Sequence, residues 1–69
     1  MTWSSQDVMR VLAAFGFSLA RRSGEDQYTK PGHPRPVTVP RSKKSIPPGT
    51  LASIWRQARI TKADAEKAR

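Results

Sequence analysis

The single histidine of this chain is the side chain best suited to proton transfer. Imidazole accepts and releases protons near neutral pH, because its unperturbed pKa is about 6.5. His33 lies in the segment Pro31-Gly32-His33-Pro34, and a loop on a rigid sheet can present such a group to a substrate. A lone histidine beside prolines is, however, more often a surface residue of a turn. No second histidine and no cluster with metal-ligand spacing accompanies it, so we expect neither a metal site nor a cofactor.

Basic side chains are the second group with evident chemistry, because cations pair with phosphates. The chain has 13 Lys and Arg residues against 5 Asp and Glu residues, which gives a net charge of +8. Eight of these basic residues lie between Gln27 and Ala63, a stretch without a single acid. The clustering indicates a polyanionic partner, nucleic acid first, although basic residues can also simply be solvated on a surface. The residues that we expect to bind RNA are Arg21, Arg22, Tyr28, Lys30, Arg35, Lys43 and Lys44.

We expect these residues to bind RNA because of their positions relative to the predicted strands. The cations flank or join predicted strands, and A-form RNA is recognised mainly through its shape, its phosphates and its 2′-hydroxyls. Arg35 lies between two prolines and therefore has little backbone freedom to lose on binding. Tyr28 is the aromatic residue for which stacking on a base stays open. Trp55 and Phe15 lie on apolar helical stripes, so we expect both in the core.

Length and composition exclude several classes of protein. A chain of 69 residues forms one domain with a small core and little room for a deep enzymatic cavity. Because it has no cysteine, it has no disulfide, no thiolate nucleophile and no zinc–thiolate site. No apolar run approaches the roughly 18 to 20 residues that span a bilayer, and the N-terminus lacks the pattern of a signal peptide. We therefore expect a cytoplasmic protein without a membrane partner, whose oligomeric state the sequence does not indicate.

Capping and periodicity predict the first helix. Ser4 is a suitable N-cap, and Asp7 three residues later completes a variant of the capping box. Apolar residues then recur at helical spacing until Gly16, which is well placed to end the helix. We therefore expect a helix over residues 5–15, and Trp3 just before its cap can pack onto the first turns.

Three strands should follow this helix. Residues 17–22 alternate at the period of a strand and stop at Ser23-Gly24. Residues 26–30 form the next strand, with Glu25 in the turn before it. A third short strand over residues 37–39 is bounded by prolines, which must lie where no ladder hydrogen bond is needed. The strands should form an antiparallel meander.

The C-terminal part of the chain predicts a second amphipathic helix. Thr50 is its expected N-cap, and the apolar residues Leu51, Ile54, Trp55 and Ala58 form the stripe that should pack toward the first helix. Thr61, with an aspartate at its N3 position, can start one or two further turns. The expected domain covers residues 1–60, and residues 61–69 form a short polar helix or tail. The predicted class is α+β with the order α-β-β-β-α, two helices covering one face of a three-stranded sheet.

Several short motifs in the second half of the chain recur together in one known family. They are Pro31-Gly32, Pro34-Arg35-Pro36-Val37-Thr38-Val39-Pro40, Lys43-Lys44, Gly49-Thr50-Leu51, Ile54 and Gln57-Ala58. This combination resembles the HicA family, small toxins of bacterial toxin–antitoxin pairs that cleave RNA. The resemblance implies a fold like that of double-stranded-RNA-binding domains, a metal-independent endoribonuclease that cleaves mRNA, and a HicB-like antitoxin that covers its active face. The family usually ends its second helix with Gln-Ala-Gly, whereas this chain has Arg59 after Ala58.

The catalytic residue implied by the resemblance differs in this chain. In HicA toxins a Gly-Ser-His-like motif before the second strand supplies a histidine, which acts as base or acid when the RNA 2′-hydroxyl attacks the neighbouring phosphate. Alignment on Tyr28 and Pro31 places Glu25 at that position, and a one-residue deletion would place Asp26 there instead. A carboxylate is normally ionised at neutral pH and would repel the phosphate it has to approach. The resemblance therefore implies a catalytically weak or inactive toxin.

Two other functions compete with this interpretation. One is a non-catalytic module that binds RNA or protein and has kept the fold while losing the enzyme. The other is a basic DNA-binding fragment, but the second helix offers only Arg56 and Arg59 as exposed basic residues, fewer than a recognition helix usually has.

Overall fold

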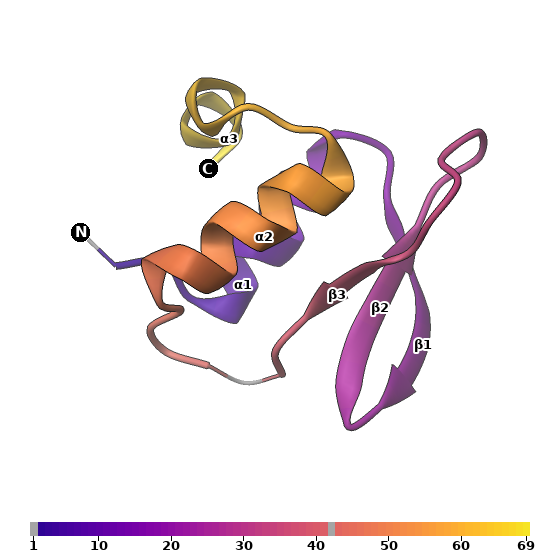
Figure 1. The fold of residues 1–69 in the computed structure, drawn as a ribbon, viewed down its shortest axis with the longest axis horizontal. Helices are drawn as coiled ribbons and strands as arrows, with labels where there is room; N and C mark the ends of the chain where they lie inside the picture. The colour runs from indigo at the N-terminus through magenta and orange to yellow at the C-terminus, as the bar shows by residue number, and fades with distance from the viewer. Residues whose placement is uncertain (1, 42) are drawn as a thin grey trace.

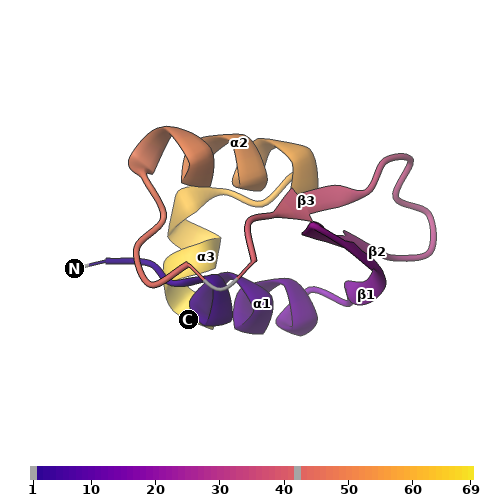
Figure 2. The ribbon, with the colours of Figure 1, turned by 90° about the horizontal axis from the view of Figure 1, so that it is seen from below.

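The structure has two layers, a small sheet and a group of helices on one side of it (Figure 1). It is a computed structural model that describes residues 2–41 and 43–69. The elements in chain order are α1 (Ser5–Ala14), β1 (Ser18–Ser23), β2 (Glu25–Thr29), β3 (Val37–Val39), α2 (Pro48–Ala58) and α3 (Lys62–Ala68). Figure 2 shows α1 and α2 as two rows beside the sheet, and α3 contacts both. The predicted α+β class and the order α-β-β-β-α are confirmed.

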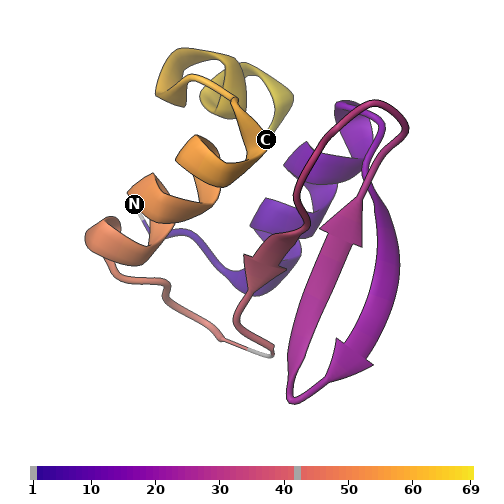
Figure 3. The same ribbon diagram turned by 45° about the vertical axis from the view of Figure 1, so that its right-hand side comes forward.

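The strands form an antiparallel meander in the order β1-β2-β3 (Figure 3). β1 and β2 pair as far as Ser23 opposite Glu25, so Gly24 turns the chain with a φ of 79°. The prediction that Glu25 lies in the turn is therefore wrong by one residue, because a single glycine in the left-handed region completes the reversal. The pairing register also shifts between Leu19 and Arg21, a bulge that simple alternation along the sequence does not reveal.

Helix α1 begins and ends as its capping residues predict. The backbone N–H of Asp7 donates to Ser4 Oγ at 3.1 Å, and the backbone N–H of Ser4 donates to the Asp7 carboxylate at 3.0 Å, which completes a capping box. At the other end Gly16 has a φ of 90°, and the N–H of Phe17 returns to the carbonyl of Leu12 at 2.9 Å. Local sequence alone therefore sets both boundaries of this helix.

Helix α2 begins earlier than the sequence indicated. Thr50 is not its cap, because the helix starts at Pro48, and the capping position is Pro47, which makes no side-chain hydrogen bond. The N–H of Leu51 already bonds to the carbonyl of Pro47 at 3.0 Å. A proline at the first helical position has the required φ and has no N–H to leave unpaired, so it replaces a polar cap. Helix α3 is capped as predicted, with the N–H of Asp64 donating to Thr61 Oγ1 at 3.1 Å.

The core lies between the helices and the helix-facing side of the sheet. The buried apolar residues are Trp3, Val8, Val11, Leu12, Phe17, Tyr28, Val37, Val39, Ile46, Ile54, Trp55, Ala58, Ile60 and Ala65. Phe15 and Leu51 are partly buried against this set, so the two predicted apolar stripes face one core. The ring of Trp3 meets Trp55 edge-on, with centroids 5.2 Å apart at 71°. This contact joins the N-terminal segment to α2.

One side chain near the end of α2 completes the edge of the sheet. β3 is an edge strand, and the backbone N–H of Thr38 donates to Gln57 Oε1 at 3.0 Å. The backbone carbonyl of Gln57 lies 2.7 Å from His33 Nε2 in the β2–β3 loop. Gln57 therefore links α2 to β3 and to the loop before it, which explains its place in the Gln57-Ala58 motif by structure alone.

The C-terminus of α2 closes with a Schellman motif that contains a strained residue. The N–H of Ile60 bonds to the carbonyl of Trp55 at 2.9 Å, and the N–H of Arg59 bonds to the carbonyl of Arg56 at 3.2 Å. Arg59 adopts the left-handed conformation, with φ 59° and ψ 40°, which glycine enters without steric cost. Arg59 is thus forced into the same geometry that the Gln-Ala-Gly ending would supply.

Replacing Arg59 with glycine should stabilise the protein. The left-handed conformation costs a non-glycine residue about 1 to 2 kcal/mol. Glycine avoids this cost, but it also gives the unfolded chain more conformational freedom, which offsets part of the gain in stability. We expect Arg59→Gly to raise the free energy of unfolding in urea by about 0.5 to 1 kcal/mol. The matched control is Arg56→Gly, an exposed position inside the helix, where glycine should lower it by about 1 kcal/mol. If both variants changed the free energy of unfolding by the same amount and in the same direction, strain at Arg59 would be contradicted.

The capping carboxylate of α1 should make stability depend on pH. The backbone N–H of Ser4 holds the pKa of Asp7 below its usual value, assisted by the Ser4 hydroxyl and by Arg69. The resulting stabilisation is present above the unfolded-state pKa near 3.8 and is lost as pH falls through the lower folded-state value. We expect Asp7→Asn to be less stable at neutral pH and to lose less stability on acidification. The measurement is the free energy of unfolding in urea at a series of pH values. If this free energy fell by the same amount on acidification in the native chain and in Asp7→Asn, the capping role of Asp7 would be contradicted.

Candidate nucleic-acid interface

The antiparallel topology divides the predicted site residues between two ends of the sheet. The β1–β2 hairpin and the exit of β3 lie at one end, which we call the hairpin end, and the β2–β3 loop lies at the other, which we call the loop end (Figures 1 and 3). The hairpin end and the chain that leaves it carry Arg21, Arg22, Glu25, Asp26, Lys43 and Lys44. The loop end carries Lys30, His33 and Arg35. The basic residues that we expect to bind RNA therefore form two groups, one at each end of the sheet.

A buried carboxylate organises the hairpin end. Asp26 is 5% exposed and faces the helix side of the sheet. Its Oδ1 lies 3.4 Å from Arg22 Nε on β1 and 3.3 Å from Arg41 Nε just after β3. Both guanidinium groups keep substantial exposure, 56% and 41% of their side chains. Asp26 therefore holds two cations at fixed positions while their outer faces remain accessible to a ligand.

Arg41 was not among the residues that sequence reasoning selected. The signal for it lies in the strand pairing, because Asp26 is opposite Val39 in the β2–β3 ladder. A residue two places beyond Val39 can therefore reach back to Asp26. This signal requires the register of β3, which its three residues and flanking prolines do not specify.

Glu25 lies at the tip of the hairpin and differs sharply from its neighbour. Its side chain is exposed, whereas Asp26 is buried, because successive residues of β2 point to opposite faces of the sheet. Only Glu25 is thus accessible to a large substrate. Glu25 lies at the same end of the sheet as these cations, and within the described residues it makes no ion pair.

The lysine pair lies in the loop between β3 and α2, and this loop is anchored to α1. Ser5 Oγ donates to the carbonyl of Pro40 at 2.6 Å and accepts the N–H of Lys43 at 2.9 Å, while the N–H of Ser5 donates to the carbonyl of Lys43 at 2.9 Å. Lys43 and Lys44 are exposed and border a hollow of about 330 Å³ together with Ser4, Ser5 and Gln6. The backbone is thus fixed while both ammonium groups reach solvent.

At the loop end, two of the predicted residues make contacts with the protein itself. Lys30 Nζ donates to the carbonyl of Phe15 at 3.4 Å and lies 4.9 Å from the centroid of the Phe17 ring. His33 packs edge-on against Phe17, with centroids 5.0 Å apart, in addition to its contact with the Gln57 carbonyl. Arg35 is exposed in the same loop. His33 and Lys30 therefore help to hold the β2–β3 loop against the helices.

Tyr28 is a core residue in this structure. It is 5% exposed, and its hydroxyl has no hydrogen-bond partner within the described residues. Burial raises the pKa of the Tyr28 phenol, and the negative charge of Asp26 raises it further. The ring therefore offers no face for stacking on a base, and the phenol stays protonated at neutral pH.

The described residues also bear on metal and membrane binding. No group of three His, Asp or Glu side chains within residues 2–41 and 43–69 is placed to hold a metal ion. None of the helices in this part of the chain has the length and apolar character to cross a membrane.

Comparison with known proteins places the chain in a family. The family model described as HicA toxin of bacterial toxin–antitoxin matches residues 5–60, which comprise α1, the whole sheet and α2. The N-terminal segment before Ser5 and helix α3 lie outside the matched region. No curated protein matches the sequence significantly. Because the match covers most of the chain, the protein belongs to the HicA family of toxins of bacterial toxin–antitoxin systems.

Proposed function

We propose that this HicA-family toxin binds RNA through the hairpin end and cleaves it weakly or not at all. The observation that carries the proposal is the carboxylate at the position aligned with the family's histidine, which is Glu25 or, with a one-residue deletion, Asp26. Around these residues Arg22, Arg41 and the lysine pair supply exposed cations on an anchored framework. The hairpin end therefore has the cations that phosphate binding requires, but it lacks the imidazole that would transfer a proton.

Neither carboxylate is well suited to replace the imidazole. The Oδ1 atom of Asp26 contacts two guanidinium groups, so it is occupied when a 2′-hydroxyl would need it as base. Glu25 is accessible, but its negative charge repels an approaching phosphate. His33 lies at the loop end with Nε2 at the Gln57 carbonyl, separated from the hairpin cations by the length of the sheet. The geometry thus favours binding over cleavage.

The same cations would suit an antitoxin that covers the RNA-binding surface. A HicB-like partner with an acidic surface would pair with the hairpin-end cations and exclude RNA by competition. A non-catalytic RNA-binding or protein-interaction module is the alternative function, and the engagement of Asp26 and His33 in contacts within the protein favours it.

RNA affinity should depend strongly on salt and on the lysine pair. Each phosphate contact releases counterions, and its loss lowers the slope of log K against log salt by about 0.7 to 0.9. We expect the double substitution of Lys43 and Lys44 by alanine to weaken binding of a single-stranded RNA at low salt and to reduce this slope. The matched control substitutes Lys62 and Lys67 on α3, which removes the same charge far from the hairpin end. RNA binding that is absent at low salt, or insensitive to salt, would refute the nucleic-acid proposal.

Restoring histidine at the hairpin should create RNA cleavage. A neutral imidazole at Glu25 removes a negative charge beside the phosphate and supplies a proton shuttle, and positioned acid–base catalysis contributes about 100- to 10,000-fold. We expect Glu25→His to cleave RNA in the presence of EDTA at a rate far above that of the native chain, measured on a labelled RNA. Glu25→Gln is the matched control, because it removes the charge without adding the shuttle. Asp26→His tests the alternative alignment.

Three outcomes would change the proposal that this toxin binds RNA and cleaves it weakly or not at all. Robust cleavage by the native chain would contradict weak catalysis, and its loss in His33→Ala would move the catalytic role to His33. If neither histidine substitution cleaves RNA while both still fold and bind it, the non-catalytic module becomes the better description.

A further inference from the structure

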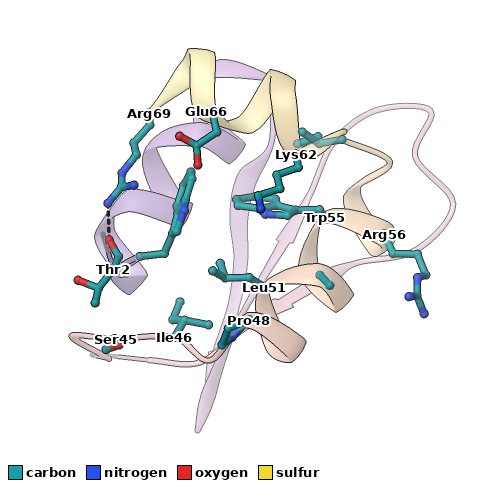
Figure 4. A pocket seen from close by; sticks show the side chains of 13 residues that line it. Thr2, Ser45, Ile46, Pro48, Leu51, Trp55, Arg56, Lys62, Glu66 and Arg69 are labelled. Carbon is teal, nitrogen blue, oxygen red and sulfur yellow. Dashed lines mark hydrogen bonds between the residues drawn. The ribbon is translucent and has the colours of Figure 1, made fainter.

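A second surface of the molecule lies away from the strands and away from the hairpin cations. It is a groove of about 720 Å³ between the N-terminal segment, the loop before α2, and helices α2 and α3 (Figure 4). Its apolar lining includes Trp3, Ile46, Leu51, Ala52, Trp55 and Ile60. No residue of the sheet contributes to it. We call this surface the α2–α3 groove.

The walls of the groove are held in place without a ligand. The N–H of Ile46 donates to the carbonyl of Trp3 at 2.7 Å, which ties the loop before α2 to the N-terminal segment. The guanidinium of Arg69 lies 4.3 Å from the centroid of the Trp3 ring, pairs with Asp7 at 3.3 Å and bonds to the carbonyl of Thr2. These contacts clamp the end of α3 onto the first residues of the chain. The groove is therefore preformed, which lowers the entropic cost of filling it.

Positive charges outnumber negative charges around the groove. Arg56 and Lys62 are exposed lining residues, and within the described residues no carboxylate lies within ion-pair distance of either. Arg69 is already paired with Asp7, and Glu66 is the one acid of the lining. In Figure 4 Lys62 extends over Trp55 at one side, while Arg56 reaches outward from α2. An apolar floor beside two available cations is complementary to an acidic, amphipathic ligand.

We propose that the α2–α3 groove docks an acidic amphipathic segment of a protein partner. Bulky aliphatic side chains of this segment fill the floor around Leu51 and Ala52, and its carboxylates pair with Arg56 and Lys62. This is the helix-in-groove mode, in which apolar residues at i, i+3 or i+4 anchor a partner helix. The proposal does not depend on RNA cleavage, and it uses none of the cations assigned to RNA binding.

Two other occupants fit the groove less well. Trp3 and Trp55 are each 7% exposed, so their faces are not available for stacking on RNA bases, whereas aliphatic side chains need only the exposed apolar lining around Leu51 and Ala52. A second copy of this chain also carries a charge of +8 and would be repelled. An acidic protein segment satisfies both the aliphatic lining and the local charge.

Selection from random peptides of about 12 residues on the immobilised full chain tests the proposal. We expect enriched peptides to carry bulky aliphatic residues at helical spacing, flanked by Asp or Glu. The affinity of the most enriched peptide can be measured directly by intrinsic fluorescence, because the two tryptophans of the chain both line the groove. Ala52→Glu, which places a carboxylate on the exposed floor, should weaken this peptide by about tenfold or more.

The matched control is Ala63→Glu, the same substitution at an exposed position of α3 outside the groove, which should leave the affinity unchanged. The double variant Arg56→Glu with Lys62→Glu reverses the two available charges beside the groove. It should bind the acidic peptide more weakly than the native chain does, and it should bind better a version of the peptide in which lysines replace the carboxylates. Circular dichroism confirms that each variant is folded. Enrichment of peptides without acidic residues, or equal affinity for Ala52→Glu and the native chain, would overturn the proposal. Displacement of the peptide by a short RNA whose own binding is lost in Ala52→Glu would assign the groove to nucleic acid instead.

Discussion

The carboxylate of Asp26 is the group on which the hairpin end of the sheet depends, because it joins three segments that are separate in sequence. It accepts contacts from Arg22 on β1 and from Arg41 after β3, while its own strand lies between them. A buried carboxylate is unfavourable without such partners, and the two cations it recruits remain accessible on their outer sides. One acid therefore organises positive charge at the hairpin end of the sheet.

The same contact supports the proposal that this chain binds RNA but cleaves it weakly or not at all. A carboxylate that orients two guanidinium groups is a structural element, and it is not equivalent to an imidazole that must gain and lose a proton. The adjacent Glu25 points to the opposite face and is accessible, but carries the wrong charge for a phosphate. His33, which has the right chemistry, is used at the other end of the sheet to hold a loop against α2. These contacts support electrostatic recognition of a polyanion as the proposed role of the hairpin end.

The family match ends at residue 60, and the elements beyond it create the second surface. Helix α3 is held to the N-terminal segment by Arg69, through a cation–π contact with Trp3 and an ion pair with Asp7. This clamp turns one side of α2 into an apolar groove, whereas the other side of α2 packs on β3 and carries Gln57. A domain of this size therefore presents two separate surfaces of different chemistry, the cations at the hairpin end of the sheet and the apolar α2–α3 groove.

The sequence determined the features that depend on near neighbours along the chain. The capping box of Ser4 and Asp7, the turn at Gly16, the strand at Val37–Val39 and the cap of α3 all follow from residues within a few positions of one another. The start of α2 was predicted three residues late, with Thr50 instead of Pro47 as the cap, because Pro47 and Pro48 begin a helix without a hydrogen-bonding side chain.

Tertiary structure alone decided the contacts that join distant segments. These are the pairing of Arg41 with Asp26, the burial of Tyr28, the bond from Thr38 to Gln57, and the clamp of Arg69 on Trp3. Each requires a strand register or a helix position that no local pattern specifies, since one residue of slippage moves a side chain to the opposite face of the sheet. The basic residues proposed to bind RNA were therefore set by the sequence, and their division between two ends of the sheet was set by the fold.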